Sequence, residues 1–147
     1  MARQTLVDSG RSGGALVTLA TTSLNAIADA AAVEVDVAND TDRDILVDLE
    51  LQISFGTAPT ADKTIDVYWR RTIDGTNYED SSASRPPANG GVGSFVLDNT
   101  TSAQRKILPG VVIPPKGGKL VIRSSAGQTA ASSGNVLRGL FYNPGIV

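Results

Sequence analysis

Apolar and polar residues alternate strictly along residues 47–55 of this chain. Acidic, amide and hydroxyl side chains separate five apolar residues, which are Val47, Leu49, Leu51, Ile53 and Phe55. A helix would scatter these five around its circumference, whereas a strand places them on one face. The segment is therefore predicted to form a half-buried β-strand.

Similar runs recur along the chain and, with residues 47–55, give ten candidate segments for a set of about eight strands. They are expected within residues 15–20, 24–27, 33–37, 64–72, 92–97, 105–108, 111–113, 119–123 and 136–142. Short strands separated by Gly, Pro, Asn and Ser clusters, with no helical pattern, indicate a sandwich, jelly roll or barrel. We expect an all-β fold: a single β-sandwich or jelly-roll-like domain at residues 15–147, with an extended N-terminal arm at residues 1–14 and long loops.

Turn residues divide the predicted strands. Asp74 and Gly75 predict a turn of hairpin type, and Pro109, Pro114 and Pro115 are expected at strand ends, where a missing N–H does least harm. The glycine- and lysine-rich residues 114–119 lack the spacing of a phosphate-binding loop and predict a hairpin loop. Residues 77–93 are too polar for a core and long enough to be an interaction loop.

Composition is consistent with one folded domain. The chain has 147 residues, of which 41% are hydrophobic and 19% charged. No apolar run approaches the roughly 18 residues that a membrane span needs, and the first residues lack the apolar stretch of a signal peptide. We therefore expect synthesis in a cytoplasm and no membrane partner.

Charge is distributed unevenly along the chain. Residues 1–84 hold fourteen acids and six bases, a net −8, whereas residues 85–147 hold one acid and seven bases, a net +6. The bases are scattered and not interleaved with aromatic residues, so no nucleic-acid partner is expected. Either the two parts neutralise one another within the fold, or acidic and basic faces meet between subunits; we favour the second interpretation.

The absence of His and Cys excludes the common nucleophilic sites, and we expect neither an enzyme nor a cofactor. Asp40, Asp42 and Asp44 mimic the opening of a calcium loop, but Ile45 replaces its glycine and Leu51 its glutamate. Oxygen ligands also cluster at positions 74, 77, 79 and 80. A plain Asx-type turn explains that cluster better than calcium does.

The aromatic residues offer one further possibility. Trp69, Tyr68 and Tyr78 could form a platform for a sugar ring. Trp69, however, is in phase with the apolar Ile65 and Val67, which predicts a core position. No catalytic residue can be nominated.

A longer pattern resembles a family of small virion structural proteins of tailed bacteriophages. It runs from the strand VYWRR through DGTNYED and a Pro/Gly loop to TSAQRKILPGVVIPPKGGKLVIRSSAGQTAASSGN. The resemblance covers roughly the last 85 residues, and its matching positions have the character of turn and packing elements.

The resemblance implies a component of a phage particle: a capsid cement (decoration) protein, or a tail, baseplate or fibre-tip protein. For the first, the partners would be the major capsid protein and copies of this chain, as a trimer, and the location would be the capsid exterior. A carbohydrate-binding β-sandwich is a third possibility. Arms and long loops suit multivalent attachment, and the candidate contact residues are Arg3, Arg11, Tyr78, Arg85, Pro86, Pro87, Tyr142, Asn143 and Ile146.

Overall fold

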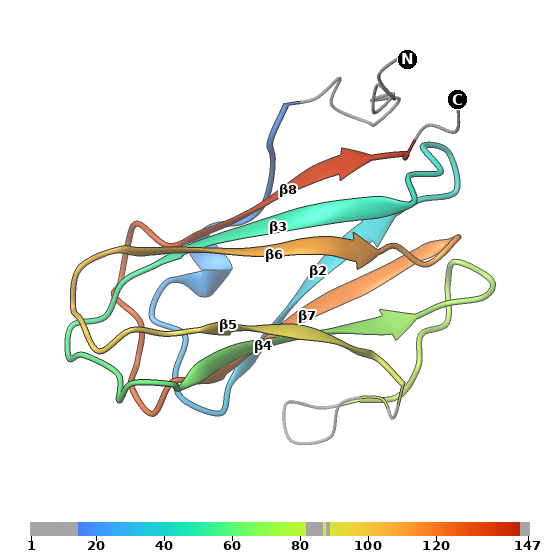
Figure 1. Ribbon diagram of the computed structural model, residues 1–147. Coiled ribbons are helices and arrows are strands. Elements are labelled where there is room, and N and C mark those ends of the chain that lie inside the picture. The colour runs from blue at the N-terminus through green and yellow to red at the C-terminus, as the bar shows by residue number, and fades with distance from the viewer. Residues whose placement is uncertain (1–14, 82–86, 88, 145–147) are drawn as a thin grey trace, which may run out of the picture.

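The all-β expectation is confirmed in a computed structural model, which describes residues 15–81, 87 and 89–144. Within those residues, eight strands form two four-stranded antiparallel sheets, with one short 3₁₀ helix as the helical element (Figure 1). The elements are β1 (Val17–Ala20), η1 (Thr22–Leu24), β2 (Ala32–Ala38), β3 (Leu46–Ile53), β4 (Thr64–Arg71), β5 (Gly91–Val96), β6 (Gln104–Val112), β7 (Gly117–Ser125) and β8 (Val136–Tyr142). The expected arm at residues 1–14 lies outside the described residues.

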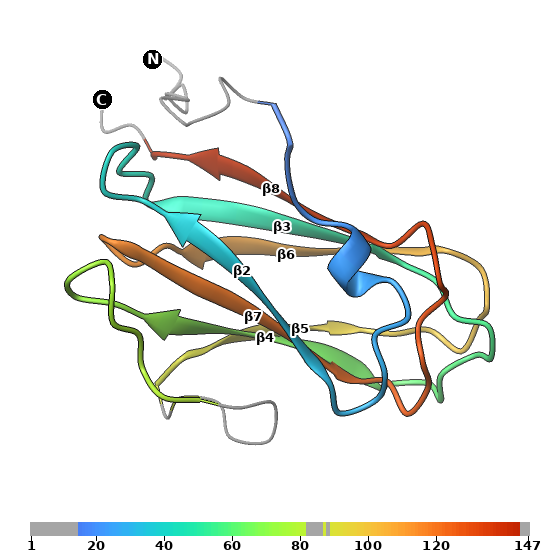
Figure 2. The same cartoon turned by 180° about the vertical axis from the view of Figure 1, so that it is seen from behind.

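The chain passes repeatedly from one sheet to the other. One sheet has the strand order β1-β8-β3-β6 and the other β2-β7-β4-β5, and Figure 2 shows the second sheet from its outer side. Only the connection from β4 to β5 stays within a sheet among the described strands. The loop at residues 114–116 is accordingly a crossover from β6 to β7, and the expectation of a hairpin loop there was wrong.

The alternating residues of the strands form a core shared by the two sheets. Val47, Leu49, Leu51 and Ile53 are all buried against residues from β4, β5 and β7. Trp69 belongs to this core at 2% exposure, and its indole Nε1 donates to the backbone carbonyl of Val112 at 3.1 Å. The predicted core position of Trp69 is confirmed, which removes it from any sugar platform.

Strand β6 continues through Pro109, which the sequence placed at a strand end. It lies at an edge of its sheet, where proline removes no bond to a further strand. The pairing with β3 shifts between Val47 and Leu49, and the side chain of Asp48 accepts the freed N–H of Gly110 at 2.7 Å. A bulge anchored by Asp48 therefore joins two segments expected as separate strands.

Residues 24–27 do not form the expected strand. Thr22–Leu24 is the 3₁₀ helix, and Ala26 has a φ of 55°. The N–H of Ala26 donates to the carbonyl of Ala131 at 2.9 Å. Leu24 and Ile27 are buried nonetheless, so these apolar residues cap one end of the core rather than extend a sheet.

Candidate interaction surface

Several residues of the phage-like pattern hold loops together. Asn135 is buried, accepts the N–H of Ser54 at 3.0 Å and donates to the carbonyl of Ala131 at 2.7 Å. Gln104 binds both the N–H and the carbonyl of Asp98, at 2.7 and 2.9 Å. These contacts agree with the interpretation of the pattern as turn and packing elements.

The turn at Asp74 is closed by its own carboxylate. Oδ1 accepts the N–H groups of Thr76 and Asn77, each at 2.8 Å, and Oδ2 accepts the side-chain amide of Asn77 at 2.7 Å. The backbone N–H groups of Asn77 and Thr76, with the amide of Asn77, hold the pKa of Asp74 far below its usual range. Gly75 adopts a φ of 82°, which glycine tolerates best. The predicted turn is confirmed as an Asx-type turn.

Glu79, beside this turn, binds the strand on the other side of the hairpin. The carboxylate of Glu79 accepts the N–H of Arg71 at 2.8 Å, and its carbonyl accepts Nε of Arg70, also at 2.8 Å. No group of three or more His, Cys, Asp or Glu side chains placed to hold a metal ion occurs in the described parts of the chain.

None of the helical segments that the structure describes could cross a membrane.

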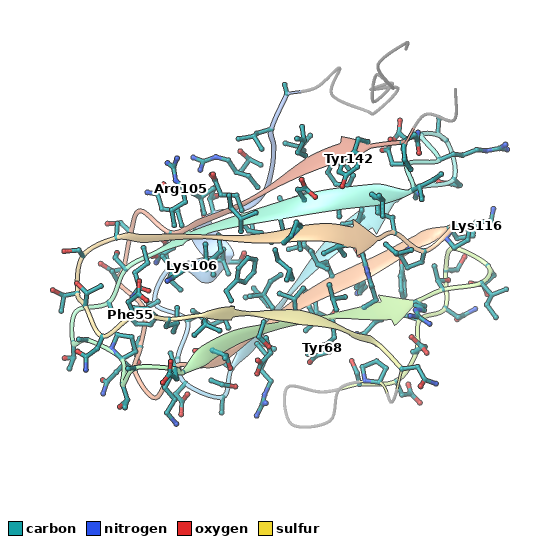
Figure 3. All side chains as sticks on the ribbon, in the orientation of Figure 1. Phe55, Tyr68, Arg105, Lys106, Lys116 and Tyr142 are labelled. Carbon is teal, nitrogen blue, oxygen red and sulfur yellow. The ribbon has the colours of Figure 1, made fainter. Side chains whose placement is uncertain are left out.

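Four segments meet at one end of the molecule, which we call the loop end: residues 39–45, 72–79, 113–117 and 142–143. It lies where β3 and β7 begin, at the right of Figure 1, and Lys116 marks it in Figure 3. The amide of buried Asn39 donates to the carbonyls of Asp44 and Pro114, at 2.8 and 3.3 Å. Ile45 bonds through its N–H to the side chain of Asn143 and through its carbonyl to the N–H of Ile113. These bonds fix three of the segments against one another.

The loop end contains three of the nine candidate contact residues. Tyr142 donates its hydroxyl to Asp48 at 3.1 Å, and burial together with that bond raises its pKa. Asn143 binds Ile45, and the ring of Tyr78 lies 5.1 Å from Nζ of Lys119. Pro87 lies elsewhere, beside the outer face of β4 and β5. Arg3, Arg11, Arg85, Pro86 and Ile146 lie outside the described residues.

Sequence reasoning missed three exposed apolar residues in or next to the loop end. Ile73, Val112 and Ile45 are 93%, 65% and 50% exposed. A hollow of about 450 Å³ lies between loops 39–45 and 113–115, lined largely by apolar atoms of Ile45, Val112, Ile113 and Pro115. The signal available was an isoleucine inside the polar turn RTIDGT, because a turn of this type needs no apolar residue there.

Charged side chains on the outer faces pair within the chain. Glu34 on β2 binds Lys119 on β7 at 3.2 Å as well as Arg70 on β4. Burial by itself would raise the pKa of Glu34, but the hydrogen bonds and charges of these two bases lower it. On the other sheet, Glu50 pairs with Arg138 at 3.0 Å and Arg105 at 3.7 Å. The acidic and basic parts of the sequence thus meet inside the fold, because β2 pairs with β7 and β3 with β6 and β8. Contact of acidic and basic faces between subunits, the interpretation we favoured, stays a prediction.

A groove of about 430 Å³ crosses the outer face of β4, β5 and β7. Asp66 lies in it and accepts the hydroxyls of Ser94 and Ser125, at 2.7 and 2.8 Å. Burial opposes the charge of Asp66, but these hydrogen bonds lower its pKa overall. Nε of Arg123, which also lines the groove, is buried and has no hydrogen-bond partner among the described residues. Tyr68, labelled in Figure 3, is only 3% exposed although it points to this outer face, and burial raises its pKa.

Comparison with known proteins adds no relative: no protein-family model, curated protein or solved structure matches the chain.

Proposed function

We propose that this chain is a bacteriophage virion structural protein, most specifically a capsid cement protein on the outside of the shell. In this role it binds across major capsid protein subunits, associates with copies of itself as a trimer and performs no catalysis. It is made in the host cytoplasm and acts in the assembled particle. The bacteriophage assignment rests on the sequence resemblance.

The strand orders β1-β8-β3-β6 and β2-β7-β4-β5 support a jelly-roll sandwich for this protein. That architecture serves in viral capsid and lectin domains. Fold alone does not give function, so the proposal needs a surface suited to attachment.

The observation that carries the proposal is the loop end. Exposed Ile73 and Ile45 lie there on hydrogen-bonded loops, and exposed Val112 adjoins it at the end of β6. Ile45 and Val112 also line the hollow, and exposed apolar patches are typical of protein–protein contacts. Because the loops are already ordered, binding through them costs little conformational entropy.

Locating the protein in intact particles by cryo-electron microscopy, with its copy number from quantitative mass spectrometry, tests the proposal. Density on the capsid exterior, at a copy number that scales with the capsid subunits, is the expected result. A copy number limited to the rotational symmetry of the tail would instead assign the chain to the tail, baseplate or fibre tip.

Attachment through the N-terminal segment has its own test. Deletion of residues 1–12 leaves every described strand in place, so the variant is expected to fold but to bind shells less tightly. The measurement is occupancy on purified shells at several protein concentrations. Full occupancy at the same concentration as the intact chain would refute a role for residues 1–12.

The groove with Asp66 and Arg123 favours a second candidate, a carbohydrate-binding β-sandwich. A sugar hydroxyl or carboxylate in the groove could accept a hydrogen bond from the guanidinium group of Arg123, which lines it. A glycan array tests this candidate with the intact protein, Arg123→Ala and the control Arg71→Ala. Binding that is lost only with Arg123→Ala would support it, and absence of binding by the intact protein would reject it.

A further inference from the structure

Strand β2 forms an edge of its sheet and lacks the features that usually protect such an edge. It pairs with β7 on one side over seven residues, Ala32–Ala38, and with no described strand on the other side (Figure 2). Its sequence, AVEVDVA, contains no Pro or Gly, and its register with β7 has no shift. A regular edge strand of this kind presents unpaired backbone N–H and C=O groups to an extended chain that comes alongside.

The other three edges of the described sheets are less open. β1 has only four residues, and its register with β8 shifts between Thr18 and Ala20. β6 contains Pro109 and shifts in register with β3. β5 shifts in register with β4 and lies in contact with β6. Short length, bulges and proline are devices by which natural sheets discourage the addition of a strand, so β2 is the edge that best admits one.

The side of β2 that faces the core is not fully covered. Val33 and Val35 lie opposite Ile122 and Leu120 of β7, which belong to the core. Val37 is 2% exposed, whereas Val33 and Val35 pack against the core and remain only partly buried. Apolar side chains on an added strand would remove this remaining apolar surface from water.

The outer side of β2 carries two acids, one of which has a free carboxylate. Glu34 binds Lys119 at 3.2 Å and also binds Arg70. Asp36 lies opposite Lys119 in the register of the two strands, but Lys119 is engaged by Glu34. Asp36 is exposed and forms no ion pair with a described residue.

The charges near Asp36 favour a basic side chain on an added strand. Asp36, Asp40 and Lys116 line a common hollow, so two acids face one base there. Lys119 and Arg70 belong to β7 and β4, which lie about 5 and 10 Å farther from an added strand than β2 does. The side chains directly opposite one another dominate the interaction of paired strands. For a strand beside β2, these opposite side chains are the acids of β2 itself.

A second copy of β2 does not satisfy these charges. Antiparallel pairing of two copies about a two-fold axis at Val35 would use the whole strand, and it would place Glu34 of each copy opposite Asp36 of the other. Like charges directly opposite one another are destabilising. The acids therefore disfavour pairing with a copy of this chain and favour a basic partner.

We propose that the free edge of β2 binds an extended segment of a partner protein in which apolar and basic residues alternate. The segment pairs with β2 through its backbone and adds a strand to the four-stranded sheet. Its apolar side chains cover Val33 and Val35, and a lysine or arginine faces Asp36. This recognition needs only β2 and does not depend on the proposed cement role.

A nuclear magnetic resonance titration of the full-length chain tests the proposal with synthetic peptides as long as β2. A peptide of alternating lysine and valine is expected to shift the amide signals of β2 and to slow their hydrogen exchange, with a dissociation constant below about 1 mM. A peptide of alternating glutamate and valine should not bind, and neither should the lysine–valine peptide with every backbone amide N-methylated. Equal binding by either control, shifts confined to other strands, or absence of binding by the lysine–valine peptide would overturn the proposal.

A charge reversal on β2 tests the role of Asp36 in the same titration. Asp36→Lys changes an exposed residue and leaves the core intact. It is expected to weaken binding of the lysine–valine peptide about 3- to 30-fold, because an attractive cross-strand pair becomes a repulsive one.

Asp62→Lys is the matched control, since Asp62 is also exposed but its N–H bonds the carbonyl of Leu97 beside β5, at the opposite edge of the sheet. This variant should bind the peptide within about 2-fold of the parent, because exposed charges this far apart are screened by salt. Urea unfolding of both variants verifies that they are folded. Unchanged binding by Asp36→Lys, or an equal loss in the two variants, would contradict the assignment of Asp36 to the contact.

Discussion

Replacing Asn135 by alanine tests whether the loops opposite the loop end depend on one buried amide. Asn135 is 2% exposed, and its two shortest side-chain bonds are to Ser54 N–H at 3.0 Å and Ala131 carbonyl at 2.7 Å. A buried polar group left without its partner costs about 1–3 kcal/mol. Removal of both bonds is therefore expected to lower the free energy of unfolding by about 4 kcal/mol, a large share of the roughly 5–15 kcal/mol of a typical domain.

Urea unfolding followed by the fluorescence of the single tryptophan measures this loss, since Trp69 is buried in the native state. The melting temperature should fall by roughly 8–16 °C. Asn135→Asp should be no better than alanine, because it keeps an acceptor for Ser54 but turns an oxygen towards the carbonyl of Ala131. Exposed Ser133→Ala is the control, expected within about 0.5 kcal/mol of the parent. A loss below about 1 kcal/mol for Asn135→Ala would refute the reasoning.

Three further changes have defined outcomes. Gly117→Ala should destabilise the fold several times more than Gly134→Ala in the same urea assay, and equal losses would contradict this. Both glycines have a positive φ, but a Cβ at residue 117 would lie 1.9 Å from the carbonyl oxygen of Val37, whereas residue 134 faces open space. Glu34→Gln should be less stable than the parent at neutral pH, and this difference in stability should shrink as the pH falls below 4.5, because the pKa of Glu34 is lowered in the folded state and the stability that its carboxylate contributes is lost on protonation. A difference in stability that is independent of pH would contradict the pairing with Arg70 and Lys119. In an ultraviolet titration, Tyr142→Phe should remove a phenol that ionises above the ordinary pKa of 10, because burial and the bond to Asp48 raise the pKa of Tyr142. Loss of a phenol that titrates at or below pH 10 would contradict that bond.

The local pattern of apolar and polar residues was sufficient to predict most of the strands and the side of each that faces the core. Alternation at residues 47–55 identified the strand that became β3, and the phase of Trp69 with Ile65 and Val67 placed it in the core. The Asp74 turn was also predictable, because its hydrogen bonds join residues within three positions of one another. Such features depend on neighbours along the chain, which is what a sequence displays.

Which strands pair, and which apolar residues line a hollow at the surface, were decided only by the tertiary structure. Alternation of apolar and polar residues identifies the inward face of a strand but not its neighbours in the sheet. The position of β3 between β6 and β8 therefore could not be predicted from the sequence pattern. Pro109 was expected to end a strand, but the edge position of β6 and the side chain of Asp48, which is far away in the sequence, let β6 continue. Likewise, Ile45 and Val112 are ordinary aliphatic residues in the sequence. They form a hollow because antiparallel pairing with β3 brings the end of β6 to the loop that precedes β3.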